Sequence, residues 1–119
     1  MSDPASVTAP LGVLFGELEP VGPRVGADVG EPMMSMRVLH STGAIEVGVW
    51  ECTPGGWAID HRANTETVHI LAGEGRITDA DGTVRELAAG VTLVLPIGWS
   101  GRWDITSTLR KLYVTAEGV

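Results

Sequence analysis

The chain has 119 residues, of which 44% are hydrophobic and 19% charged, a balance that fits one globular domain and leaves no room for a second. Its formal net charge of −7 and its eight scattered Lys and Arg residues disfavour a partner with a phosphate backbone, so we expect no nucleic-acid binding. A single cysteine excludes an internal disulfide, and neither a secretory leader nor a membrane-length apolar run is visible, so we expect a cytoplasmic protein without a membrane partner.

Residues 1–32 combine proline, glycine and acidic residues with one short apolar stretch, Leu11 to Leu18. Proline fixes φ and lacks a backbone N–H, so the prolines of this segment exclude a long helix. We therefore predict an N-terminal extended arm over residues 1–32 that pairs with another surface. The pattern changes at Met33, and residues 33–119 are predicted to form the barrel domain.

Two segments with a period of two follow the arm, Met33 to His40 and Ala44 to Cys52, with the turn Ser41-Thr42-Gly43 between them. Alternation of this period is typical of strands, so the pair is predicted to form a β-hairpin. Cys52 has no basic neighbour in the sequence, and we expect a buried, inert thiol rather than a nucleophile.

The segment 54–73 carries the most chemistry in the chain. A glycine-rich turn precedes His61, and Glu66 opens an apolar strand that is predicted to stop at the turn Gly73-Glu74-Gly75. Successive residues of a strand point to opposite faces. This alternation predicts an inward face of Glu66, Val68 and Ile70 and an outward face of Thr67, His69 and Leu71.

Short strands continue to the C-terminus. Asp81-Gly82 is a favoured pair for a tight reversal, so residues 76–87 are predicted to fold back on themselves. The β-branched run Val91 to Leu95 ends at Pro96, and Leu109 to Thr115 forms a last strand. Seven or eight short strands without an amphipathic helix predict an all-β closed sandwich or barrel.

Two spaced motifs resemble those of the cupin superfamily. Their residues are Gly55, His61, Glu66 and Gly73 in the first motif and Gly90, Pro96 and Gly98 in the second. Four further stretches resemble the small Cupin 3 group: Val49 to Gly55, His69 to Gly73, Pro96 to Trp103 and Leu109 to Tyr113. That group is related to the cupin domains of (S)-ureidoglycine aminohydrolase and of ethanolamine-utilisation protein Q. The resemblance implies a single-domain double-stranded β-helix, the RmlC-like jelly-roll barrel, with its ligand cavity at the open mouth.

The resemblance also implies a divalent metal held by histidines and a glutamate at the mouth. One histidine of the first motif is missing, and Gly101 stands where the second motif has its histidine. His61 and Glu66 remain as candidate metal ligands and as the best candidates for catalytic residues. Because a catalytic metal usually keeps at least three protein ligands, this site is incomplete and a metal is the less favoured reading. The alternative makes Glu66 a pocket carboxylate held by Arg62, Arg102 or a tryptophan N–H, with His61 as polar lining.

Tryptophan is the most frequent aromatic residue, with four copies against one Phe and one Tyr. We predict that Trp57, Trp99 and Trp103 wall the mouth and bind substrate together with His61 and Glu66. Packing in the core is the alternative use of large aromatic side chains, and it is the one expected for Trp50.

Two further features leave alternatives open. Lys111 and Tyr113 share one side of the last strand and could supply an ammonium and a phenol to the pocket, although a solvated lysine is the ordinary outcome. Met33, Met34 and Met36 form an apolar cluster that suits either a core or a dimer seam.

The favoured function is binding of a small polar metabolite in the pocket of a small single-domain cupin with a degenerate metal site. One alternative is a metal-assisted or acid–base hydrolase or isomerase similar to ureidoglycine aminohydrolase, with Glu66 as base or ligand and His61 as its partner. Another is a non-catalytic scaffold in which the arm and the methionines form a homodimer.

Overall fold

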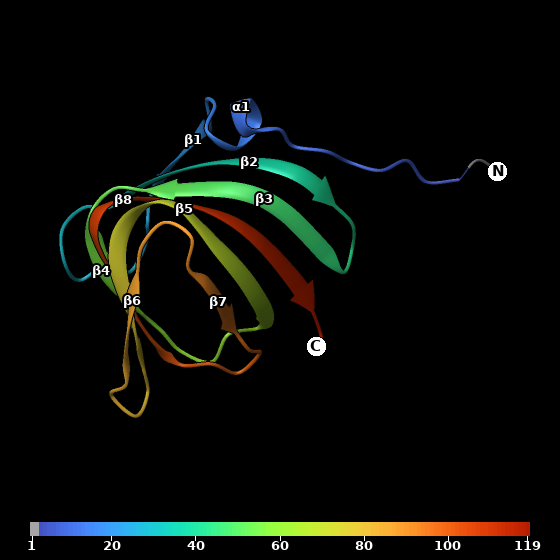
Figure 1. Cartoon of the computed structure of the whole chain (residues 1–119). Helices are drawn as coiled ribbons and strands as arrows, with labels where there is room; N and C mark the ends of the chain where they lie inside the picture. The colour runs from blue at the N-terminus through green and yellow to red at the C-terminus, as the bar shows by residue number, and fades with distance from the viewer. Residues whose placement is uncertain (1–2) are drawn as a thin grey trace.

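The computed structural model describes residues 3–119 and is built almost entirely of antiparallel strands (Figure 1). The all-β prediction is therefore confirmed. In chain order the elements are α1 (Leu11–Leu14), β1 (Glu19–Pro23), β2 (Met33–Ser41), β3 (Ile45–Cys52), β4 (Gly55–Ile59), β5 (Asn64–Asp79), β6 (Val84–Leu87), β7 (Thr92–Leu95) and β8 (Gly101–Glu117).

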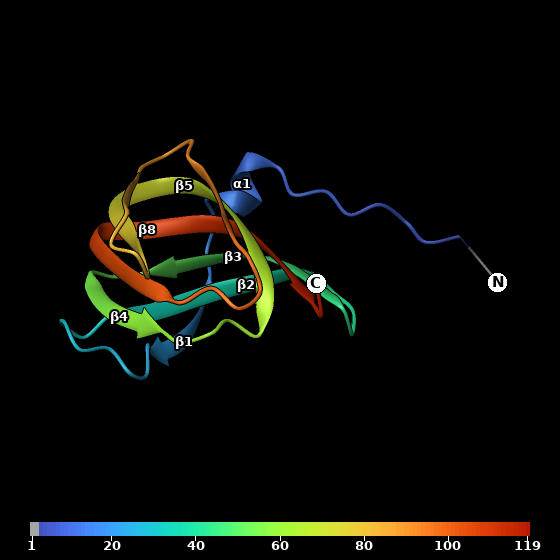
Figure 2. The ribbon, with the colours of Figure 1, turned by 90° about the horizontal axis from the view of Figure 1, so that it is seen from below.

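Two long curved strands, β5 and β8, hold the barrel together. They pair with each other along most of their length, and the sheet runs in the order β1-β2-β3-β8-β5-β6, with β4 beside β8 and β7 beside β5. The first half of β8 pairs with β4, and its second half pairs with β3. The curvature rolls the sheet around an interior that Figure 2 shows from below.

The local hairpins agree with the sequence predictions. β2 and β3 pair antiparallel, and β5 pairs with β6 across a turn in which Gly82 has a φ of 89°. That left-handed conformation is one glycine adopts without steric cost, as expected for the Asp81-Gly82 reversal.

The predicted turn at Gly73-Glu74-Gly75 is wrong. β5 continues through these residues to Asp79, and the pairing with β8 shifts register there instead. Gly73 has a φ of 91°, and a Cβ at this position would overlap the Thr108 carbonyl oxygen of β8. A left-handed glycine in close contact with a partner strand is therefore the signature of a β-bulge here.

The N-terminal segment adds an edge to the sheet. β1 pairs with β2, and the residues before α1 extend away from the barrel (Figure 1). The Arg110 guanidinium on β8 donates hydrogen bonds to the carbonyl oxygens of Leu14 and Gly16, at 2.9 and 2.8 Å. Residues 1–2 of the predicted arm lie outside the described residues. No helix within residues 3–119 has the length and apolar character that crossing a membrane requires.

The core fills the barrel interior. Val68 and Ile70 are fully buried and Glu66 is nearly so, which confirms the predicted inward face of this strand. Cys52 is also fully buried, as expected, and burial raises the pKa of its thiol to about 11. The thiol is therefore protonated at neutral pH and is a poor nucleophile.

Candidate functional site

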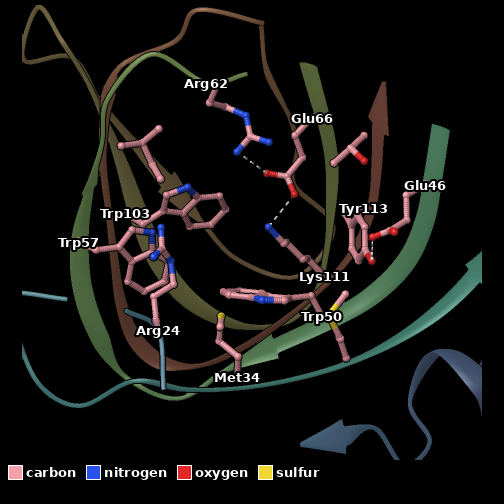
Figure 3. Close-up of a pocket in the computed structure, with 13 residues that line it drawn as sticks. Arg24, Met34, Glu46, Trp50, Trp57, Arg62, Glu66, Trp103, Lys111 and Tyr113 are labelled. Carbon is pink, nitrogen blue, oxygen red and sulfur yellow. Dashed lines mark hydrogen bonds and ion pairs between the residues drawn. The ribbon is translucent and has the colours of Figure 1, made fainter. Parts of the chain in front are cut away.

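A cavity of about 260 Å³ opens at one end of the barrel (Figure 3). Three tryptophans on three strands form its apolar wall: Trp50 on β3, Trp57 on β4 and Trp103 on β8. Trp57 and Trp103 are direct partners across the β4–β8 ladder, and their rings stack with centroids 6.2 Å apart. Trp50 meets Trp57 edge-on at 6.2 Å, so the three rings form one aromatic cluster. Trp50 was expected to serve packing alone, but it faces the cavity as well.

A buried ion pair lies against this aromatic cluster. The Lys111 ammonium donates a hydrogen bond of 2.9 Å to Glu66 Oε2, and the two side chains are only 8% and 7% exposed. The same ammonium lies 4.4 Å from the ring centroid of Trp50 and 4.6 Å from that of Trp103. Cation–π contacts of this kind stabilise a cation that has lost its water. The expectation of a solvated Lys111 is therefore wrong, because Glu66 and two indole rings replace its hydration.

The second oxygen of Glu66 faces another cation. Arg62 Nη1 lies 3.3 Å from Glu66 Oε1, and Asn64 orients the guanidinium by accepting hydrogen bonds from Nε and Nη2. The partners predicted for Glu66 were Arg62, Arg102 or a tryptophan N–H. Of these, Arg62 contacts the Glu66 carboxylate. Arg102 instead binds Asp28 at 2.7 and 2.8 Å, and this contact lowers the pKa of the Asp28 carboxyl.

A second carboxylate lines the cavity and is bound by a phenol. The Tyr113 hydroxyl donates a hydrogen bond of 2.8 Å to Glu46 Oε2. Burial, together with this hydrogen bond, raises the pKa of Tyr113 above its ordinary range. The ring fits because its β3 partner is Gly48, where a Cβ would overlap the phenol. Tyr113 therefore remains a neutral hydrogen-bond donor in this cavity.

His61 and Trp99 lie apart from the cavity lining, although the sequence placed both at the site. His61 has a φ of 50° and a side chain that is 79% exposed, with Nδ1 2.5 Å from Asp60 Oδ1. The indole N–H of Trp99 donates to Asp79 Oδ1 at 2.9 Å. The structure thus brings together Glu66, Trp57 and Trp103 of the predicted site residues.

The residues at the mouth do not fit a divalent metal. Within residues 3–119, no group of three His, Cys, Asp or Glu side chains is placed to hold an ion. Both oxygens of Glu66 already contact cations, and the His61 imidazole lies outside the cavity lining. A metal would have to displace Lys111 from Glu66 and would find too few further ligands.

Two charged residues that line the cavity, Arg24 and Glu46, were not singled out from the sequence. Arg24 lies between β1 and β2, and its guanidinium lies 5.2 Å from the ring centroid of Trp57. No local pattern marks this contact, because it depends on the path of the chain after β1. Met34 and Met36 also line the cavity, while Met33 is exposed. The methionine cluster is thus divided between the interior and the surface.

Comparison with known proteins identifies the family. The family model Cupin_3, EutQ-like cupin domain, matches residues 39–113. No curated protein matches the chain significantly.

Solved structures share the fold at low sequence identity. A candidate ethanolamine utilization protein Q from Salmonella typhimurium LT2 has a TM-score of 0.66 and 16% identity, and the match covers 87% of this chain and all of that one. EutQ from Clostridium difficile has a TM-score of 0.63 and 17% identity, with 72% of this chain and 69% of that chain covered. A protein with unknown function from Pseudomonas syringae pv. tomato has a TM-score of 0.77 and 21% identity, with 86% of this chain but only 45% of that chain covered. These similarities establish the jelly-roll barrel and leave the chemistry to the residues of the site.

Proposed function

This chain belongs to the EutQ-like cupin domain family, and we propose that it binds a small polar metabolite in the barrel cavity without a metal. The observation that carries the proposal is the Glu66–Lys111 ion pair, which faces a cavity walled by Trp50, Trp57 and Trp103. Glu66 is the polar anchor of the proposed site, and the tryptophans supply the apolar wall. This combination of an apolar wall with a few oriented polar groups is typical of small-molecule sites.

The burial of this ion pair is an argument for a binding site, because a buried ion pair often stabilises a protein no more than apolar residues of the same size would. Removing two charges from water costs several kcal/mol per ion, and apolar residues of the same size often stabilise a protein as well or better. A charged pair that is retained at the wall of a cavity therefore points to a role in recognition. The cavity volume of about 260 Å³ suits a small metabolite rather than a peptide.

Intrinsic fluorescence tests the proposal directly, because three of the four tryptophans line the cavity. In a Trp99→Phe variant, every remaining tryptophan reports on the proposed site. Titration with a library of small polar metabolites is expected to change the emission of this variant with saturation. The same compounds should raise the melting temperature as their concentration increases.

Glu66→Gln provides the matched test of the anchor, with Glu86→Gln on β6 as a control outside the cavity. A compound that binds the Trp99→Phe background should bind at least tenfold more weakly after Glu66→Gln, since a hydrogen bond to a charged group is lost. Glu86→Gln should leave the affinity unchanged. Saturable binding that is indifferent to Glu66→Gln would remove Glu66 as the anchor, and the absence of any ligand would overturn the proposal.

An acid–base enzyme is the second candidate, and one contact favours it. Glu66 and Lys111 lie within hydrogen-bond distance of each other at the cavity wall, so a bound substrate could exchange a proton with either group. If the protein is an enzyme, Lys111→Met should abolish turnover of a compound that still binds. Turnover that survives both Lys111→Met and Glu66→Gln would exclude this chemistry.

We further propose that the protein is a homodimer and that it is cytoplasmic. Support for the dimer comes from exposed apolar side chains on the N-terminal segment, Val7, Leu11 and Phe15. Exposed apolar surface of this kind is a common feature of protein–protein contacts.

A further inference from the structure

We propose that the ligand of the barrel cavity is a small organic anion, a carboxylate with a largely apolar body that also carries a hydrogen-bond donor for Glu66, and that Arg24 binds its charged end. This inference rests on the proposed function and names the class of ligand. Three observations support it. The charges inside the cavity do not balance, the Arg24 guanidinium has no carboxylate partner within residues 3–119, and the aromatic cluster already binds the ammonium of Lys111.

Cationic side chains outnumber carboxylates in the cavity lining. Arg24, Arg62 and Lys111 face Glu46 and Glu66. Glu46 accepts the Tyr113 hydroxyl, and Glu66 is shared between Lys111 and Arg62. One positive charge is thus left without a carboxylate, in a protein whose formal net charge is −7. An anionic ligand would balance the charge inside the cavity.

Arg24 is the side chain that carries this unbalanced charge. Its backbone N–H donates to the Pro32 carbonyl oxygen at 2.9 Å, which fixes the residue at the rim, and its guanidinium lies over Trp57 (Figure 3). The only side-chain hydrogen bond from Arg24 within residues 3–119 goes from Nη1 to the Val25 carbonyl oxygen, and no carboxylate of that range forms a salt bridge with it. Arginine presents five donors in a planar fork that matches a carboxylate. Most of these donors remain available to a ligand.

The aromatic cluster argues against a cationic ligand. Clusters of indole rings commonly bind ammonium groups of ligands. Here the ammonium of Lys111 already lies over Trp50 and Trp103. A second cation would meet three positive side chains in the cavity lining, whereas an anion is attracted by them and its apolar body can contact the aromatic cluster.

Three probes of nearly equal shape separate the charge classes: benzoate, benzamide and benzamidinium. Isothermal titration calorimetry of the full chain at neutral pH measures each affinity. We expect benzoate to bind most tightly, benzamide more weakly and benzamidinium most weakly. Nonspecific binding of benzoate elsewhere is disfavoured by the negative net charge of the protein.

Variants of Arg24 test its role. Arg24→Gln should weaken benzoate binding roughly tenfold or more, since a charge-assisted contact is lost, and should leave benzamide nearly unchanged. Arg24→Lys should retain part of the benzoate affinity. The control Arg37→Gln removes the same charge from an exposed position on β2 outside the cavity lining and should have no effect.

The outcomes separate this inference from the proposed function. If benzamide or benzamidinium binds as tightly as benzoate, or if Arg24→Gln acts no differently from Arg37→Gln, the inference is overturned and metabolite binding stands. If none of the three probes binds at its highest soluble concentration and the metabolite library also gives no ligand, both are overturned.

Discussion

Lys111 gives this barrel a cation of its own. Its ammonium contacts one oxygen of Glu66 and the faces of two tryptophans. These groups would otherwise be the ones to bind a cation from solution. Nothing in the local sequence between Leu109 and Tyr113 indicates that Lys111 is buried. Its partner Glu66 is 45 residues away, and only the pairing of β5 with β8 brings the two together. The sequence therefore predicted that Glu66 points inward and named Arg62 among its candidate partners, but it could not predict the contact with Lys111.

A double-mutant cycle tests this pair at the residue scale. Lys111→Met should lower the free energy of unfolding by about 3 kcal/mol, because it leaves a buried carboxylate with Arg62 alone. Glu66→Gln should also destabilise, by leaving the ammonium without a carboxylate. The variant with both changes should lose less stability than the sum of the two, as measured by urea unfolding. Strictly additive losses would mean that the two groups do not interact.

The only tyrosine of the chain offers a second test, because its titration can be followed by the ultraviolet absorbance of tyrosinate. Burial raises the pKa of Tyr113 above its ordinary value of 10.0, so ionisation of the folded protein should begin well above that pH. The folded state holds this proton more tightly than the unfolded state. The stabilisation is therefore complete below pH 10.0 and is lost as pH rises towards the folded-state pKa.

Cys52 acts in the same direction, because its pKa is raised from 9.0 to about 11. The free energy of unfolding should thus fall with rising pH from about pH 9. Tyr113→Phe should remove only the contribution of the phenol, which begins above pH 10, and should leave the contribution of Cys52 between about pH 9 and pH 11. A tyrosinate signal that appears at the pH of free tyrosine would contradict the buried phenol.

At the scale of the elements, the predictions were correct where local residues decide the structure. The hairpin of β2 and β3 follows from alternation, and the β5–β6 reversal follows from Asp81-Gly82. The prediction failed at Gly73, because a glycine with positive φ serves a turn and a bulge equally well. The difference depends on β8, which passes so close to Gly73 that no side chain fits.

Substitution of Gly73 tests how closely β8 packs against this residue. Gly73→Ala should lower the free energy of unfolding by roughly 2–4 kcal/mol, since it combines a positive φ with overlap against the Thr108 carbonyl. Gly82→Ala is the matched control, because Gly82 has a φ of 89° with open space around it, against 91° for Gly73. The control should cost only the backbone strain, about 1–2 kcal/mol. Equal losses in thermal or urea unfolding would show that β8 is not in contact with the bulge.

At the scale of the whole molecule, the N-terminal segment adds an edge strand and exposed apolar side chains to the barrel. β1 extends the sheet beyond β2, and the segment before β1 leaves Val7, Leu11 and Phe15 exposed. The path of this segment depends on pairing with β2 and on the contact of Arg110 with the carbonyls of Leu14 and Gly16. Composition predicted an arm, but these long-range contacts were beyond any local pattern.

Sedimentation velocity tests the proposed homodimer. The full chain should sediment as a dimer, and the variant Leu11→Ser/Phe15→Ser should shift towards the monomer, because it removes exposed apolar surface from the segment. Val84→Ser, at an exposed apolar position on β6, is the control and should not change the sedimentation. A full chain that remains monomeric at high concentration would contradict the dimer.

We propose that a lysine, and not a metal ion, neutralises Glu66 inside the barrel. A crystal structure of the protein grown with added Mn²⁺, Zn²⁺ or Ni²⁺ tests this claim most directly. We expect the Lys111 ammonium within hydrogen-bond distance of Glu66, with no metal bonded to that carboxylate. A metal ion coordinated by Glu66, with Lys111 turned away, would contradict it.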